Sequence, residues 1–178
     1  MVNVMDAREP KSERILRMIK QMRLEESVVD VNVKFEKLVI FSLAGELFAF
    51  AGRLVKEILI CQEISFVPGS PGFLLGVMNV RGDIESVASL AVILGIPQLA
   101  PSALNRILIV EDDHTRSGIL VDKVEDVIDV PFDSIKPPLV TMNGLIAENL
   151  KGETVYRGRT VLVLDITKVF KRFGSDEQ

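Results

Sequence analysis

The chain has 178 residues, a formal net charge of −4, 48% apolar residues and 26% charged residues. This balance is typical of a folded globular protein and argues against disorder, while the acidic charge disfavours nucleic acid as a partner. No apolar run approaches the roughly 20 residues that cross a bilayer, and the polar N-terminus lacks the apolar core of a signal peptide. We therefore expect a cytoplasmic protein.

The first segment, residues 6–26, predicts a helix. Ile15, Met18, Ile19 and Met22 recur at helical spacing, and Ser12 can cap the start. Two roles stay open for this helix: an appendage to its own domain, or a surface for dimerisation or partner binding. Residues 26–37 are interpreted as a linker, so that residues 1–36 form an extension, 37–171 the domain and 172–178 a tail.

From residue 37 onward the apolar pattern changes to short runs separated by turn residues, as expected for β-strands. The expected strands of the first half are residues 38–41, 47–50, 64–67, 76–79 and 84–87, and a short segment at 55–60 lies between the second and third of them. Residues 44–46 and 81–83 are interpreted as hairpin turns. Ser89 can cap a short helix at 90–94, which Gly95 ends.

The same order of elements then repeats. The second half predicts strands at 107–110, 118–121 and 161–164, a segment at 124–127 that matches 55–58, a hairpin that begins at 144–146, and a helix at 166–170 capped by Asp165. Ile109 aligns with Ile40 and Val124 with Val55, both 69 positions apart (109 − 40, 124 − 55), and Asp126 falls on Glu57. The repeat predicts two barrels of about five strands, with a third apolar seam where they meet.

Residues suited to catalysis are scarce. The single histidine, His114, lies in an acidic hairpin tip, where a metal site or a nucleophile triad would need convergent partners. Cys61 is interpreted as a small buried hydrophobe. The chain has neither a phosphate-binding G-x-x-x-x-G-K-[ST] loop nor a G-x-G-x-x-G motif. We expect no enzyme activity, cofactor or metal, with chemistry at His114 as a remote alternative.

The most distinctive segment runs from Gly76 to Gly82 with the sequence G-V-M-N-V-R-G. Asn79 can bond its own backbone and Gly82 can take positive φ, so both favour a tight turn. Arg81 would then project from this hairpin. A solvated turn arginine is the plain interpretation; an anchoring donor to a partner's carboxylate is the functional one.

This hairpin resembles the G-V-x-N-L-R-G hairpin of the CheW family, the coupling proteins of bacterial chemosensory arrays. Further matching motifs are Phe41-Ser42-Leu43 with Gly45, Val55-x-Glu57-Ile58, Pro71-x-Phe73, Gly118-Ile119-x-Val121-Asp122-x-Val124-x-Asp126-Val127 and Leu162-Val163-Leu164. They occur in family order over residues 37–170. Each motif is weak alone, and their combination is specific.

The resemblance implies a mainly β fold, in which two SH3-like five-stranded barrels form one CheW-like domain. It also implies a non-enzymatic adaptor that links methyl-accepting chemoreceptors to the regulatory domain of a CheA-type histidine kinase, at arrays on the inner face of the membrane. The implied receptor-binding residues are Glu57, Asn79, Arg81, Gly82, Val124 and Val127. The implied kinase-binding residues are Val55 and Gly76.

The match breaks after the hairpin, where the family has a Pro followed by Asp-Leu-Arg. This chain has Ser86 and then Ser89-Leu90-Ala91, together with the acids Asp83 and Glu85. We expect these acids to change the charge of a partner surface and hence partner choice. One alternative is a CheW-like scaffold that no longer couples the standard kinase and serves another pathway. A small-barrel nucleic-acid binder is a further, disfavoured alternative.

Overall fold

The computed structural model describes residues 33–98, 100–113, 115–138 and 144–174. The chain divides into two units, residues 1–34 and 35–178, and the described strands and helices lie in the second. The helix predicted at 6–26 and the side chain of His114 lie outside the described residues.

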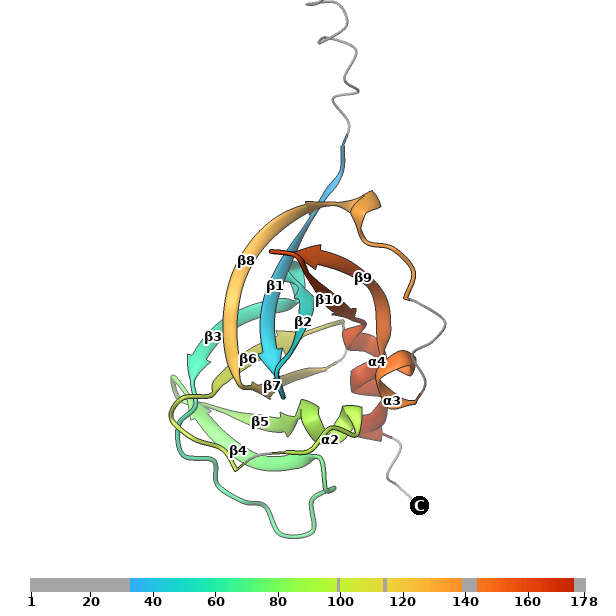
Figure 1. Cartoon of the computed structure of the whole chain (residues 1–178). Helices are drawn as coiled ribbons and strands as arrows, with labels where there is room; N and C mark the ends of the chain where they lie inside the picture. Colours follow the sequence, from blue (N-terminus) through green and yellow to red (C-terminus); the bar gives the residue numbers. More distant parts are fainter. Residues whose placement is uncertain (1–32, 99, 114, 139–143, 175–178) are drawn as a thin grey trace, which may run out of the picture. The chain divides into compact units, whose positions relative to one another are not determined.

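The described part of the chain is mainly β, as the sequence predicts (Figure 1). Its strands are β1 (Phe35–Leu43), β2 (Glu46–Ala51), β3 (Val55–Ile60), β4 (Leu74–Val80), β5 (Asp83–Ser89), β6 (Arg106–Glu111), β7 (Arg116–Val121), β8 (Lys123–Pro131), β9 (Leu150–Tyr156) and β10 (Arg159–Leu164). Its helices are α2 (Leu90–Leu94), α3 (Leu145–Glu148) and α4 (Ile166–Lys171), with 3-10 turns η1 (Gly52–Leu54), η2 (Phe132–Ser134) and η3 (Arg172–Gly174).

The strands form two five-stranded sheets, in the orders β8-β1-β2-β10-β9 and β3-β6-β7-β5-β4. The pairs β2/β10 and β5/β7 are parallel and the other pairs are antiparallel, so both sheets are mixed. This confirms the predicted fold class. We call them sheet 1 and sheet 2 in that order.

The two halves of the chain exchange strands between the sheets. Strands β6 to β8 repeat β1 to β3 at the offset of 69, and β9, β10 and α4 repeat β4, β5 and α2 at an offset of 76 (150 − 74, 165 − 89). Sheet 1 takes β1 and β2 from the first half and β8 to β10 from the second, whereas sheet 2 takes β3 to β5 and then β6 and β7. One half is therefore not one barrel, because its first two strands lie in one sheet and its last three in the other.

Each curled sheet is closed by the segment that follows one of its edge strands, β3 or β8. Ser65, after β3, forms two backbone hydrogen bonds with Val77 of β4 (2.8 and 2.9 Å), and Lys136, after β8, does the same with Glu153 of β9 (both 2.8 Å). Strands β3 and β4 are the two edges of sheet 2, and β8 and β9 are those of sheet 1. The closure therefore satisfies edge groups that a flat sheet would leave open.

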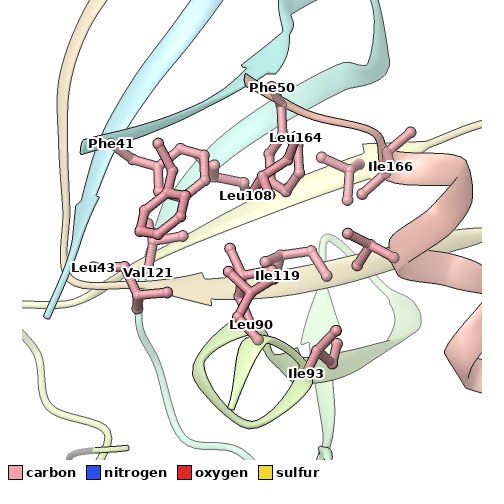
Figure 2. Close-up of a cluster of buried hydrophobic side chains, with 14 of the residues drawn as sticks. Phe41, Leu43, Phe50, Leu90, Ile93, Leu108, Ile119, Val121, Leu164 and Ile166 are labelled. Atoms are coloured by element: carbon pink, nitrogen blue, oxygen red, sulfur yellow. The ribbon is translucent and has the colours of Figure 1, made fainter. Parts of the chain in front are cut away.

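The largest core lies between the sheets, which confirms the predicted third seam (Figure 2). Sheet 1 contributes Phe41, Phe50 and Leu164, and sheet 2 contributes Leu108, Ile119 and Val121. Leu90 and Ile93 of α2 and Ile166 of α4 complete it. Fully burying one such side chain is worth about 1.5–3 kcal/mol. Smaller clusters fill each barrel, around Ile40 in sheet 1 and Ile107 in sheet 2.

The helices α2 and α4 begin where the sequence predicts. The Ser89 side chain accepts a hydrogen bond from the Val92 N–H (3.3 Å), and Asp165 accepts from Thr167 (3.1 Å) and Lys168 (3.4 Å). Gly95 ends α2 in the left-handed region at φ 67°. Capping at equivalent positions thus holds two very short helices against the shared core.

Two predicted elements are wrong. Residues 64–67 form no strand, since only Ser65 pairs with β4 and Pro68 cannot donate to a ladder. Residues 144–146 do not begin a hairpin strand: Leu145 starts α3, where the Glu148 N–H bonds the Gly144 carbonyl (3.2 Å), and β9 starts only at Leu150. Both errors concern short apolar runs, whose periodicity cannot separate strand from helix or loop.

Gly76 and Gly152 are equivalent residues that permit the two closures. A Cβ on Gly76 would lie 2.2 Å from the Ser65 carbonyl oxygen, and one on Gly152 would lie 2.6 Å from the Lys136 carbonyl oxygen. Any side chain here would push the closing segment away. These glycines are therefore required by close backbone approach.

We expect Gly152→Ala to destabilise the fold by about 1–3 kcal/mol, because the added methyl meets backbone that cannot move without breaking the Lys136–Glu153 bridge. Urea unfolding measures the change. Gly72→Ala is the matched control, since nothing lies within 4 Å of its added Cβ. Equal stabilities of the two variants would contradict the packing argument.

Candidate functional site

The β4–β5 hairpin presents Arg81 at its tip. Arg81 and Gly82 occupy the two central positions of the turn and both have positive φ, 56° and 103°. This is the geometry of a type I′ turn, whose twist matches that of the strands it joins. The Gly82 N–H donates to the Asn79 side chain (2.9 Å), so Asn79 fixes the turn from within β4.

The Arg81 guanidinium donates to the Glu57 carboxylate on β3. The Arg81 side chain is 81% exposed and the Glu57 side chain 20% exposed. Because β3 and β4 are opposite edges of sheet 2, this ion pair spans the barrel closure beside the Ser65–Val77 bridge. It holds a charged donor at a defined place on the surface.

The structure brings four of the predicted site residues together: Glu57, Asn79, Arg81 and Gly82. Val124 and Val127 lie instead on β8, in sheet 1. Val127 is exposed, whereas Val124 packs against the core between the sheets.

The predicted kinase-binding residues have packing roles. Val55 packs against the core between the sheets, as its equivalent Val124 does. Gly76 is buried beneath the Ser65 carbonyl. Neither residue presents an extended exposed surface. They would therefore affect a partner indirectly, by setting the shape of the strands around them.

Sheet 1 carries an equivalent arrangement that sequence reasoning missed. Arg157 and Gly158 form the β9–β10 turn with φ values of 49° and 75°, and they stand 76 positions after Arg81 and Gly82. Arg157 lies 3.5 Å from the carboxylate of Asp126, the residue equivalent to Glu57. The motifs V-R-G-D and Y-R-G-R could have revealed this pair, had the repeat been continued with the longer offset.

Asp126 differs from Glu57 because it accepts hydrogen bonds from more donor groups. Its carboxylate accepts from the Tyr156 hydroxyl (2.6 Å) and from the Val127 N–H (2.8 Å). The Tyr156 hydrogen bond foremost, then the Val127 N–H, lowers the Asp126 pKa below its ordinary value, and the Arg157 charge adds to this. The same bond raises the pKa of Tyr156. The pair is therefore held as carboxylate and neutral phenol.

We expect Tyr156→Phe to raise the pKa of Asp126 toward its ordinary value, as measured by carboxyl NMR titration. Because the folded pKa is lowered, the ionised carboxylate stabilises the fold above the ordinary pKa, and this contribution is lost as pH falls through the folded pKa. The stability difference between wild type and variant should therefore shrink on acidification. A constant difference from neutral to acidic pH would contradict the assignment.

The acid Glu85 is buried, so it does not add an exposed charge as the sequence predicts. Its carboxylate accepts from Arg116 of β7 at 2.6 Å, and Arg116 also pairs with Glu111 at 3.0 Å. Glu85 is 8% exposed. Its charge is therefore compensated internally, while Asp83, at the hairpin, is exposed.

The neighbouring serine is also satisfied internally. Ser86 shares a 2.9 Å hydrogen bond with Ser117, which is fully buried. Glu85 with Arg116 and Ser86 with Ser117 occupy the places that Val161 with Leu47 and Leu162 with Phe48 occupy in sheet 1. Two apolar cross-strand pairs of one barrel are thus polar pairs in the other.

We expect Arg116→Leu alone to cost roughly 1–3 kcal/mol of stability, because it leaves the buried Glu85 without its cation. The partial exposure of Arg116 keeps the effect below that of a fully buried pair. The double variant Glu85→Val with Arg116→Leu, which copies the sheet 1 pair, should recover most of this loss in urea unfolding. Additive losses would show that the two side chains do not interact.

Comparison with known proteins gives one consistent result. A family model described as CheW-like domain matches residues 37–173. The chain is 28% identical over 151 residues to a chemotaxis protein CheW of Thermotoga maritima, covering 85% of this chain and 97% of the relative. It is 25% identical over 150 residues to a probable chemotaxis protein CheW of Rhizobium etli, covering 84% and 97%.

Among solved structures, the scaffolding protein TtCheW from Thermoanaerobacter tengcongensis superposes with a TM-score of 0.70 at 30% identity. The match covers 78% of this chain and 94% of that one. In the described part of the chain, no helix is long and apolar enough to span a membrane.

Proposed function

The chain belongs to the CheW-like domain family and is a non-enzymatic coupling protein of chemotaxis, and from this premise we propose its partners and their sites. One partner is the cytoplasmic tip of a methyl-accepting chemoreceptor. The other is the regulatory domain of a CheA-type histidine kinase. The complex forms in the cytoplasm, at receptor arrays on the inner face of the membrane. Residues 37–171 carry the coupling, between an extension at 1–36 and a tail at 172–178.

The β4–β5 hairpin carries the receptor proposal. Its I′ turn fixes an exposed guanidinium, and Glu57 keeps that group aimed across the barrel closure. A helical receptor segment can lay an apolar face on the strands and place a carboxylate at Arg81. Asn79 and Gly82 maintain the turn, and Val124 and Val127 supply apolar contact from β8.

The kinase contact is proposed around Val55 and Gly76. Val55 begins β3 directly after η1, and Gly76 lets the segment after β3 cross β4. Substitution at either place would change the shape of the β3–β4 edge more than its chemistry. We therefore assign to the kinase domain the part of this edge around Val55 and Gly76, and keep the hairpin tip at Arg81 for the receptor.

The alternative of a scaffold that has lost the standard kinase depends on the altered stretch from Ser86 to Ala91. Glu85 and Ala91 are buried, and Ser86 bonds Ser117. These changes are accommodated within the domain. We therefore favour coupling to a kinase over the alternative.

We expect Arg81→Ala to weaken binding of a soluble chemoreceptor tip fragment by roughly tenfold or more, through loss of charge-assisted hydrogen bonds. Binding of the kinase regulatory domain should stay unchanged. Calorimetric titration of each partner measures both effects. Arg53→Ala is the matched control for receptor binding: its side chain is 67% exposed and lies outside the proposed receptor site.

An equal loss of receptor binding in Arg53→Ala would indicate a general charge effect. Unchanged receptor binding in Arg81→Ala would remove the assignment of Arg81. Thermal unfolding of both variants shows whether the fold is intact.

A further inference from the structure

The β9–β10 turn repeats the proposed receptor-contacting turn in another part of the molecule. Arg157 and Gly158 copy the positions and the left-handed backbone of Arg81 and Gly82. Each arginine faces an acid on an edge strand of its own sheet: Arg157 faces Asp126 on β8, and Arg81 faces Glu57 on β3. The internal repeat has therefore duplicated an exposed arginine together with the acid that orients it.

The acid at this second turn is already occupied by other donors. Asp126 accepts the Tyr156 hydroxyl at 2.6 Å and the Val127 N–H at 2.8 Å. Arg157 approaches it only to 3.5 Å, beyond the usual range for a strong N–H···O bond. The guanidinium also stacks over the Tyr156 ring at 4.8 Å. Tyr156 thus positions the Arg157 guanidinium, whose N–H groups remain available to bind another carboxylate.

The surroundings of Arg157 suit an apolar segment. The Arg157 side chain is 76% exposed, and Val155, two residues before it, is 67% exposed. At the first turn the equivalent of this valine is Asn79. An exposed cation beside an exposed valine complements a helical face that carries apolar residues and one carboxylate.

We infer that the β9–β10 turn is a second docking surface, formed by Asp126, Val155, Tyr156 and Arg157. It binds a second carboxylate-bearing helical segment of the receptor-tip class. The chain is then bivalent toward receptors, with one segment on each sheet. This inference rests on the proposed function, since it takes the ligand class from the Arg81 surface.

The test is NMR titration of the ¹⁵N-labelled full chain with a monomeric receptor-tip hairpin fragment, alongside calorimetric stoichiometry. We expect two fragments per chain and shifts of the Gly82 and Gly158 amides. Arg157→Ala should reduce the stoichiometry to one and abolish the Gly158 response while leaving that of Gly82. Arg81→Ala should give the opposite pattern. Arg157→Lys should restore part of the binding.

The outcomes separate the two proposals. One fragment per chain with shifts confined to Gly82 overturns the second surface and leaves the proposed function standing. One fragment that shifts both amides also overturns it, because a single segment would then span both turns. Absence of binding to the folded wild-type chain overturns the receptor proposal, and the second surface with it. Persistence of both sites in Arg157→Ala removes Arg157 from the surface.

Discussion

The division of each half's strands between the two sheets is the constraint on which the rest of the structure depends. Each sheet joins the first two strands of one half to the last three strands of the other half. Neither half can therefore complete its barrel alone, and the core between the sheets forms with the same step. Because these contacts join residues far apart in sequence, we expect the domain to fold as one cooperative unit.

This constraint also explains where the exposed arginines lie. Each sheet closes between its two edge strands, β3 with β4 or β8 with β9. At this closure the arginine of a hairpin tip reaches an acid on β3 or β8. A partner's carboxylate then competes with an internal one. Such competition limits the affinity gained from each arginine while fixing its direction, which suits an adaptor that binds reversibly.

Much of this architecture could be predicted from sequence, and the missing parts share a cause. Turn chemistry and caps are local, so Ser89, Asp165 and the Arg81–Gly82 turn followed from a few residues each. The offset of 69 revealed the repeat, but pairing partners are not local. Nothing in the pattern of β3 says that it pairs with β6 rather than within its own half. For the same reason the burial of Glu85 against Arg116 could not be foreseen.

The comparison of the two barrels shows how such a repeat diverges. At equivalent cross-strand positions one barrel has Leu47 with Val161 and the other has Arg116 with Glu85. A Glu85 without Arg116 would be a buried, unpaired charge, so the acid requires its partner to keep the barrel stable. By contrast the exposed turns differ without a matching change: both carry an arginine, but Tyr156 stands where the first turn has Val80. Surface turns can therefore acquire separate partners while the paired interior positions stay coupled.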